Sequence, residues 1–157
     1  MSSVGMVKEM VSVQFEDFDI GAEYQQLAQG TDAGAIVTFV GKVRDMNLGD
    51  SVTGLSLEHY PGMTERSLVS ICEQAKQRWP LLNIRVIHRV GDLNLGDQIV
   101  YVGVSSAHRN AAFEACEFVM DYLKTQAPFW KKERTTEEVR WVDSRDSDAT
   151  AAERWQS

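Results

Sequence analysis

The chain has 157 residues, of which 43% are hydrophobic, and this size and composition fit a single domain with a sizeable buried core. Its 16 Lys and Arg residues are outnumbered by 23 Asp and Glu residues, and the formal net charge of -7 argues against general binding to nucleic acid or anionic membranes. No apolar run approaches the length of about 20 residues that a membrane helix requires, and residues 1–10 lack the pattern of a signal peptide. We therefore expect a cytoplasmic protein.

The first part of the chain reads as short strands around one helix. Residues 1–10 are an N-terminal extension, and residues 11–15 alternate as a strand. Asp19 is a candidate cap for a short helix that ends near Gly30. Two strands follow at residues 35–43 and 52–60, and the polar segment between them reads as a mobile loop. We expect these two strands to form a hairpin with a long exposed tip.

Two long helices dominate the rest of the chain. The first spans residues 64–79, with Thr64 as its cap and Pro80 as its stop. The second opens at Ser106 or Asn110 and ends before Pro128. The residues expected to line one face of this second helix are Phe113, Cys116, Met120 and Leu123.

Four more strands are predicted around these helices, at residues 84–90, 98–105, 129–135 and 138–142. A turn-rich segment joins the first two of them, and the polar tail at residues 143–157 is expected to be loose or only conditionally ordered. This order predicts one α+β domain over residues 11–142, with a mixed or antiparallel sheet.

Familiar motifs are absent. Val43 follows Gly41-Lys42 where a phosphate-binding loop requires Ser or Thr, and no GxGxxG follows a strand. The three histidines are not paired at helical spacing, so we predict neither a metal site nor a bound cofactor. Cys72 and Cys116 lie far apart among apolar residues, which favours buried free thiols over a disulfide.

The cations near the second long helix suggest an anion site. His108 and Arg109 fall where the helix begins, and exposed N–H groups there favour anions, although ordinary capping polarity explains them equally well. Lys124 shares a helix face with the apolar stripe, so it either snorkels at the rim of the core or projects into a cleft. In a cleft, loss of solvent would lower its pKa and suit it to proton transfer.

Pro128 turns the chain after this helix. In an extended segment, Phe129, Lys131 and Glu133 share one face and Trp130 and Lys132 share the other. This alternation would bring Lys131 back toward Lys124. The alternative is a basic edge strand, which proteins use to discourage aggregation.

Five segments resemble a known family. They read FVGKVRDMNLGDSV, LEHYPGMTE, VIHRVGDLNLGD, GVSSAHRNAAFEA and MDYLKTQAPFWKKE, and they are similar to the large, catalytic subunits of molybdopterin synthase from about Phe15 to Trp155. The resemblance implies an α/β hammerhead-like fold and a homodimer. It also implies a small ubiquitin-like partner at each end, whose C-terminal Gly-Gly carries a thiocarboxylate. The implied reaction inserts two sulfurs into cyclic pyranopterin monophosphate to form molybdopterin.

The resemblance also implies a set of site residues. The implied catalytic residues are Lys124 and Lys131. The implied substrate-binding residues are Lys42, Val43, Arg44, His108, Arg109, Lys132 and Glu133. In the family the anion site draws on both protomers, so His108 and Arg109 are expected to serve the neighbouring subunit. Many relatives have arginine at the position of Lys132, which keeps the charge.

Other interpretations compete with this one. A phosphate-binding module would share the charges without needing the two lysines to converge, and another phosphate-sugar transferase would turn over without a small subunit. Cys72 or Cys116 would be the sulfur carrier in a third mechanism. Phe129 and Trp130 are either anchors for an extended peptide tail or plain core. The tail around Trp155 is expected to order on the partner, so that its deletion weakens partner affinity more than thermal stability.

Overall fold

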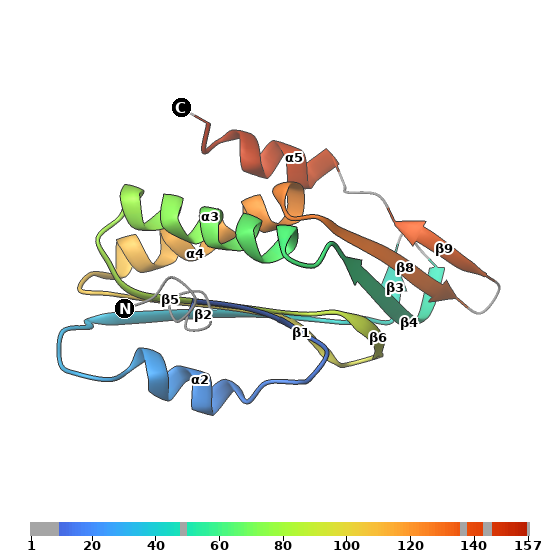
Figure 1. Cartoon of the computed structure of the whole chain (residues 1–157), viewed down its shortest axis with the longest axis horizontal. Helices are drawn as coiled ribbons and strands as arrows, with labels where there is room; N and C mark the ends of the chain where they lie inside the picture. Colours follow the sequence, from blue (N-terminus) through green and yellow to red (C-terminus); the bar gives the residue numbers. More distant parts are fainter. Residues whose placement is uncertain (1–9, 48–49, 136–137, 143–145, 157) are drawn as a thin grey trace.

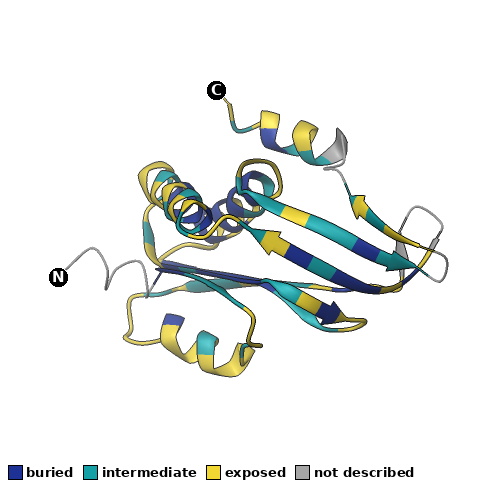
Figure 2. Ribbon diagram, turned by 45° about the vertical axis from the view of Figure 1, so that its right-hand side comes forward, coloured by how far each residue is buried: buried dark blue, intermediate teal, exposed yellow. Residues whose placement is uncertain are grey.

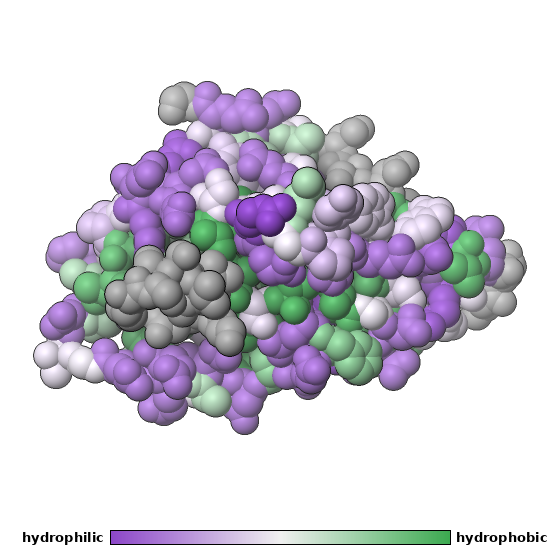
Figure 3. Space-filling model, in the orientation of Figure 1, coloured by the Kyte–Doolittle hydropathy of each residue, from purple (hydrophilic) through white to green (hydrophobic). Residues whose placement is uncertain are grey.

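The computed structural model describes residues 10–47, 50–135, 138–142 and 146–156. The predicted N-terminal extension lies outside the described residues apart from Met10, which is buried in the core. Within the described part of the chain, no helix is long and apolar enough to cross a membrane. The face of the molecule in Figure 3 is mostly hydrophilic, and its apolar groups are scattered rather than joined in one area.

A four-stranded sheet forms one half of the fold. Its strands, in spatial order, are β1 (Val11–Gln14), β5 (Leu81–Arg89), β7 (Gln98–Ser106) and β2 (Ala35–Lys42). The β1–β5 pair is parallel and the other pairs are antiparallel. The two long helices α3 (Met63–Arg78) and α4 (Arg109–Gln126) cover one face, and the short helix α2 (Ile20–Leu27) covers the other (Figure 1).

A second, antiparallel sheet extends from the end of the first one (Figure 1). Its strands are β3 (Met46–Asn47), β4 (Asp50–His59), β8 (Phe129–Thr135) and β9 (Val139–Val142), with β6 (Gly91–Asn94) paired to the other side of β4. The predicted single α+β domain with a mixed sheet and two long helices is thus confirmed.

The main core lies between the first sheet and the helices α3 and α4, where the ribbon is dark blue in Figure 2. Apolar residues recur at spacings of three and four along α4, and those buried include Ala112, Ala115, Val119 and Leu123. Small side chains at two of these positions let α4 approach the sheet closely. Phe113, which the sequence placed on this face, is 59% exposed, so that assignment was wrong.

The predicted hairpin was also wrong. β2 pairs with β7 in the first sheet, whereas β4 pairs with β3, β6 and β8 in the second. The segment expected to be a mobile loop contains β3, which pairs with the start of β4 in a short hairpin of its own; residues 48–49 lie outside the described residues. The turn-rich connection after β5 likewise contains strand β6. Strand β2 thus belongs to the first sheet alone, and residues 42–44 at its end lie where the two sheets meet.

Helix α3 starts earlier than the sequence suggested. Its N-cap is Gly62, whose φ of 83° is a left-handed conformation that glycine adopts without strain. Thr64 lies inside the first turn and is fully buried. Its hydroxyl accepts from the Tyr60 amide at 3.0 Å and donates to the Pro128 carbonyl at 3.2 Å. Thr64 therefore ties the start of α3 to the turn between α4 and β8.

The C-terminal tail is not loose where it is described. Helix α5 (Asp146–Glu153) packs on α4, and Trp155 lies edge-on to Trp79 and Phe118 in the core cluster. The Trp155 indole N–H donates to the Asp121 carboxylate at 2.6 Å. The tail is thus anchored within this chain, and we now expect its deletion to lower stability directly.

Candidate active site

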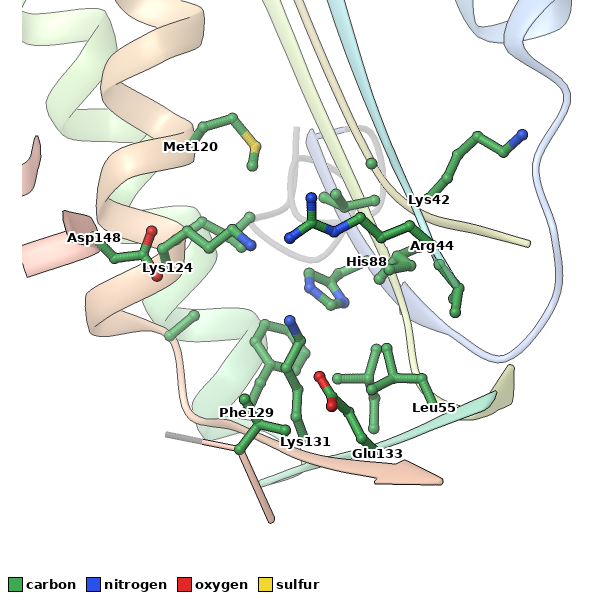
Figure 4. A pocket seen from close by; sticks show the side chains of 18 of the residues that line it. Lys42, Arg44, Leu55, His88, Met120, Lys124, Phe129, Lys131, Glu133 and Asp148 are labelled. Atoms are coloured by element: carbon green, nitrogen blue, oxygen red, sulfur yellow. The ribbon is translucent and has the colours of Figure 1, made fainter. Parts of the chain in front are cut away.

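A cavity of about 520 Å³ lies where the two sheets meet beneath the C-terminal end of α4 (Figure 4). Its walls come from the end of β2, from β4, β5, β7 and β8, and from the last turns of α4. A cavity of this volume is typical of a site for a small organic ligand. Residues far apart in sequence meet here because β2 and the α4–β8 turn both end at the sheet junction.

Lys124 and Lys131 both line this cavity. Lys124 lies in the last turn of α4, where the helix dipole favours a cation. Pro128 then breaks the helix, and β8 runs back along β4 with Lys131 opposite Leu57. Figure 4 shows both ammonium groups turned toward the same space, next to the His88 ring. The structure thus brings together two amino groups from separate elements.

The faces of β8 follow the predicted alternation. Phe129, Lys131 and Glu133 line the cavity, whereas Trp130 is exposed on the opposite face. Lys132 is also on that outer face, where it lies 3.8 Å from the Glu58 carboxylate and its ammonium is 4.4 Å from the centre of the Trp141 ring. The structure therefore does not bring Lys132 into the cavity of this chain.

Lys42, the last residue of β2, and the two residues after it were all predicted for the site, but they have different roles. Arg44 lines the cavity, and its guanidinium points toward Lys124 in Figure 4. Lys42 also borders the cavity, but its ammonium is directed away from the other cations. Val43 is buried and packs with Leu55 and other apolar residues in the small core beneath the second sheet, so its contribution to the wall is apolar.

Glu133 is the buried carboxylate of the site. It is only 6% exposed, and its Oε2 accepts from the Arg140 guanidinium of β9 at 3.3 Å. A buried carboxylate needs such a partner to offset its loss of hydration. Arg140 therefore lets an acidic group remain beside Lys131 in the cavity wall.

His88 is a site residue that the sequence analysis missed, because a histidine within an apolar strand carries no local sign of a cavity. It is 6% exposed, its ring stacks on Phe129 at 3.8 Å between centroids, and its Nδ1 lies 2.8 Å from the Arg89 carbonyl oxygen. The pKa of His88 is lowered to about 4, mainly by burial and in smaller part by the charges of Lys124 and Lys131. A weaker signal lay in the alternation of the strand: His88 continues the inward-facing row of Ile84 and Val86, where a polar side chain can mark the end of the core.

Other wall residues were missed for a simpler reason, since no local pattern points to them. Met120, Thr125 and Phe39 contribute from α4 and β2, and Asp148 contributes from the C-terminal helix α5. In Figure 4 the Asp148 carboxylate lies beside the Lys124 side chain. The tail that was expected to be loose therefore supplies an acidic group to the wall.

His108 and Arg109 lie at the other end of α4. His108 is the N-cap and Arg109 the first residue of the helix, and both are exposed. Arg109 and Lys124 are separated by 15 residues of α-helix, about 22 Å along the axis at 1.5 Å per residue. The fold of one chain thus does not bring His108 and Arg109 to the cavity of that chain.

The thiols are poorly suited to sulfur transfer. Cys72 and Cys116 are both buried in the main core, and burial raises the pKa of each to about 12. A thiolate is the reactive form, so such cysteines are inert near neutral pH. Among the described residues, no group of three or more His, Cys, Asp or Glu side chains is placed to hold a metal ion.

The charges and apolar surfaces of the cavity indicate its chemistry. Arg44, Lys124 and Lys131 supply positive charge, although the chain as a whole carries a net charge of -7. Apolar side chains such as Leu55 and Phe129 form the adjoining wall. The site is therefore suited to a ligand with an anionic group and a flat, partly apolar body, and its lysines are placed to stabilise negative charge that develops during a reaction.

Comparison with known proteins places the chain among close relatives. The family model described as MoaE protein matches residues 13–126. The molybdopterin synthase catalytic subunit of Vibrio cholerae is 73% identical over 146 residues, covering 93% of this chain and 97% of the relative. That of Escherichia coli K12 is 57% identical and covers 96% and 100%. The solved structure of the molybdopterin biosynthesis MoaE protein from Burkholderia ambifaria is 49% identical, with a TM-score of 0.80 over 94% of this chain and 98% of that one.

Proposed function

The chain belongs to the MoaE protein family, and we propose that it is the catalytic subunit of a molybdopterin synthase. In this role it transfers two sulfurs into cyclic pyranopterin monophosphate to give the dithiolene of molybdopterin. The observation that carries the proposal is the convergence of Lys124 and Lys131 on one positively lined cavity. This is the arrangement that separates a catalyst from a simple anion-binding module.

The sulfur comes from a partner protein in this proposal. The two cysteines of this chain are buried with raised pKa values, so neither is a suitable carrier. A small ubiquitin-like subunit with a C-terminal Gly-Gly thiocarboxylate supplies the sulfur instead. Its extended tail enters the cavity, where each sulfur forms a C–S bond to a carbon that bears oxygen while the C–O bond at that carbon breaks. One of the two oxygens leaves on the phosphate when the cyclic ester opens, and the other leaves as water. Water then hydrolyses the thioester that results and releases the tail as a carboxylate.

The lysines and Arg44 divide the work. Arg44 presents a planar guanidinium, which suits bidentate binding of the substrate phosphate. Both the attack by sulfur and the hydrolysis create transient negative charge near Lys124 and Lys131. We assign Lys124 as the principal acid/base or charge-stabilising group and Lys131 as its partner, each contributing about 2 to 4 kcal/mol to lowering the barrier. Lys42, Val43 and Glu133 complete the substrate-binding wall.

The proposal is tested by reconstitution. Purified chain is mixed with the thiocarboxylated small subunit and cyclic pyranopterin monophosphate, and the product is oxidised to a fluorescent pterin and quantified. We expect product only when all three components are present. A binding module would give none, and product without the small subunit would indicate a different transferase.

His108 and Arg109 enter the proposal through a homodimer. Because they lie at the far end of α4 from Lys124, we propose that they complete the cavity of the neighbouring protomer. Mixing a Lys124→Ala variant with an Arg109→Ala variant tests this. Random pairing makes half of the dimers mixed, and each mixed dimer has one intact site, so activity should return to about a quarter of the wild-type value. Action within one chain predicts no recovery on mixing.

Two further points complete the proposal. Lys132 lies outside the cavity of its own chain, beside Glu58 on the outer face of β8. We propose that its positive charge there contributes to binding a partner protein. We also propose a cytoplasmic location. The free thiols of Cys72 and Cys116 support it, since disulfides are rare in that compartment.

A further inference from the structure

We propose that the Nε2 atom of His88 is the hydrogen-bond acceptor for a ring N–H of the bound pterin. The inference rests on the proposed function and adds a substrate-recognising residue to it. It starts from three features of His88: a tautomer that is fixed by its surroundings, a ring that is held in place, and a position in the wall of the cavity.

The tautomer follows from the Arg89 carbonyl. Nδ1 of His88 lies 2.8 Å from this oxygen, and a carbonyl oxygen only accepts, so Nδ1 carries the proton. In a neutral imidazole the other nitrogen then has a lone pair and no proton. Phe129 stacks against the ring at 3.8 Å with an interplanar angle of 20°, which fixes the plane in which that lone pair points. The acceptor is thus set before any ligand arrives.

The position of His88 makes this acceptor available to a ligand. His88 is on the face of β5 that carries Ile84 and Val86 into the main core, one step beyond this apolar row, and it lines the cavity. Since Nδ1 is the donor to Arg89, Nε2 is the ring nitrogen that can accept from a ligand N–H in the cavity, where the ring is largely shielded from solvent.

Neutrality of the ring is maintained at physiological pH. The pKa of His88 is lowered to about 4, mainly by burial and in smaller part by the charges of Lys124 on α4, Lys131 on β8 and His59 on β4, while the bond to the Arg89 carbonyl opposes the shift. A protonated imidazole would donate from both nitrogens and would repel a ligand N–H. The ring of His88 therefore remains neutral at physiological pH, and its Nε2 atom remains an acceptor.

The cavity otherwise favours groups that accept. Arg44, Lys124 and Lys131 carry only donors, whereas the two carboxylates of the wall face cations: Glu133 accepts from Arg140, and Asp148 lies beside Lys124. These donors suit a phosphate and a carbonyl, but a pterin also has ring and amino N–H groups that need acceptors. A site built to hydrogen-bond such a group rejects analogues that lack it far more strongly than an apolar pocket does. His88 thus selects for the heterocycle, whereas Arg44 binds the phosphate.

Two substitutions separate the nitrogens of His88. In His88→Gln the terminal amide reaches the place of Nε2, and in His88→Asn the shorter amide takes the place of Nδ1 and keeps the bond to Arg89. We expect His88→Asn to raise KM for the cyclic monophosphate about tenfold, the equivalent of one lost hydrogen bond, with a much smaller change in kcat. His88→Gln should stay within about threefold of wild type in KM. A KM defect in His88→Gln that is absent in His88→Asn would overturn the inference, and so would equal effects of both.

A measurement on the wild-type chain removes any dependence on how the variants fold. With ¹⁵N-labelled histidine, we expect the Nε2 resonance of His88 to be that of an unprotonated nitrogen and to move to lower frequency when the cyclic monophosphate saturates the site. A resonance that does not move would overturn the inference while leaving the synthase activity standing. Absence of any turnover by wild-type chain with its thiocarboxylated partner would instead refute the proposed function itself.

Discussion

Acid should destabilise this protein through His88. The pKa of this histidine is about 4 in the folded state against 6.5 for an unperturbed side chain, mainly because burial disfavours the charged ring. Between these two values the unfolded chain binds more protons than the folded one, so the free energy of unfolding falls as pH decreases. The full difference corresponds to about 3 kcal/mol, and about 1.4 kcal/mol of it is lost between pH 7.5 and pH 5.5.

Urea unfolding followed by tryptophan fluorescence at these two pH values measures the effect. The lower value stays above the sequence pI of about 4.9, where the chain would tend to precipitate. Carboxylates also titrate on acidification, so the informative quantity is the difference between wild type and His88→Gln, which cannot titrate at this position. We expect wild type to lose about 1.4 kcal/mol more than the variant over this interval. The same loss in both proteins would refute the reasoning about a buried, neutral His88.

Three further substitutions test the packing and the sulfur source. Trp155→Ala should lower the free energy of unfolding by about 2 kcal/mol, because the indole packs in the core cluster and donates to the Asp121 carboxylate. Its control, Trp130→Ala at an exposed position, should lower it by under about 0.5 kcal/mol. Equal urea midpoints for the two variants would contradict an anchored tail. Thr64→Val should lower the free energy of unfolding by about 1 to 3 kcal/mol, since the buried hydroxyl loses its bonds to the Tyr60 amide and the Pro128 carbonyl; the exposed Thr38→Val is its control. Cys116→Ala should keep most of the rate of product formation in the reconstituted assay, and loss of activity with an intact fold would favour the persulfide mechanism.

Local periodicity predicted the elements and their faces well. The alternation at residues 129–133 placed Lys131 and Glu133 on one side and Lys132 on the other, as the structure has them. The cap at Asp19 is confirmed by its bond to the Ala22 amide at 3.0 Å. These features depend on neighbouring residues along the chain, so the sequence contains them directly.

The pairing of strands that are far apart in sequence was harder to predict. The strands β2 and β4 follow one another in sequence and both have the alternation of a strand, but that pattern gives a face and not a partner. The structural role of Thr64 could not be predicted, because the Pro128 carbonyl that accepts from its hydroxyl is 64 positions away in sequence. Asp148 belongs to the cavity only because helix α5 folds back onto α4.

The lysine pair is tested most directly by the rate of a single sulfur transfer. The Lys124→Ala variant and the thiocarboxylated small subunit are mixed in excess over the cyclic monophosphate, and product is followed over time. The control variant is Lys76→Ala, at an exposed position of α3. We predict that Lys124→Ala lowers the rate about 30- to 1,000-fold, the equivalent of 2 to 4 kcal/mol, while its unfolding midpoint stays close to wild type, and that Lys76→Ala changes neither. A folded Lys124→Ala variant that transfers sulfur within about threefold of the wild-type rate would contradict the account.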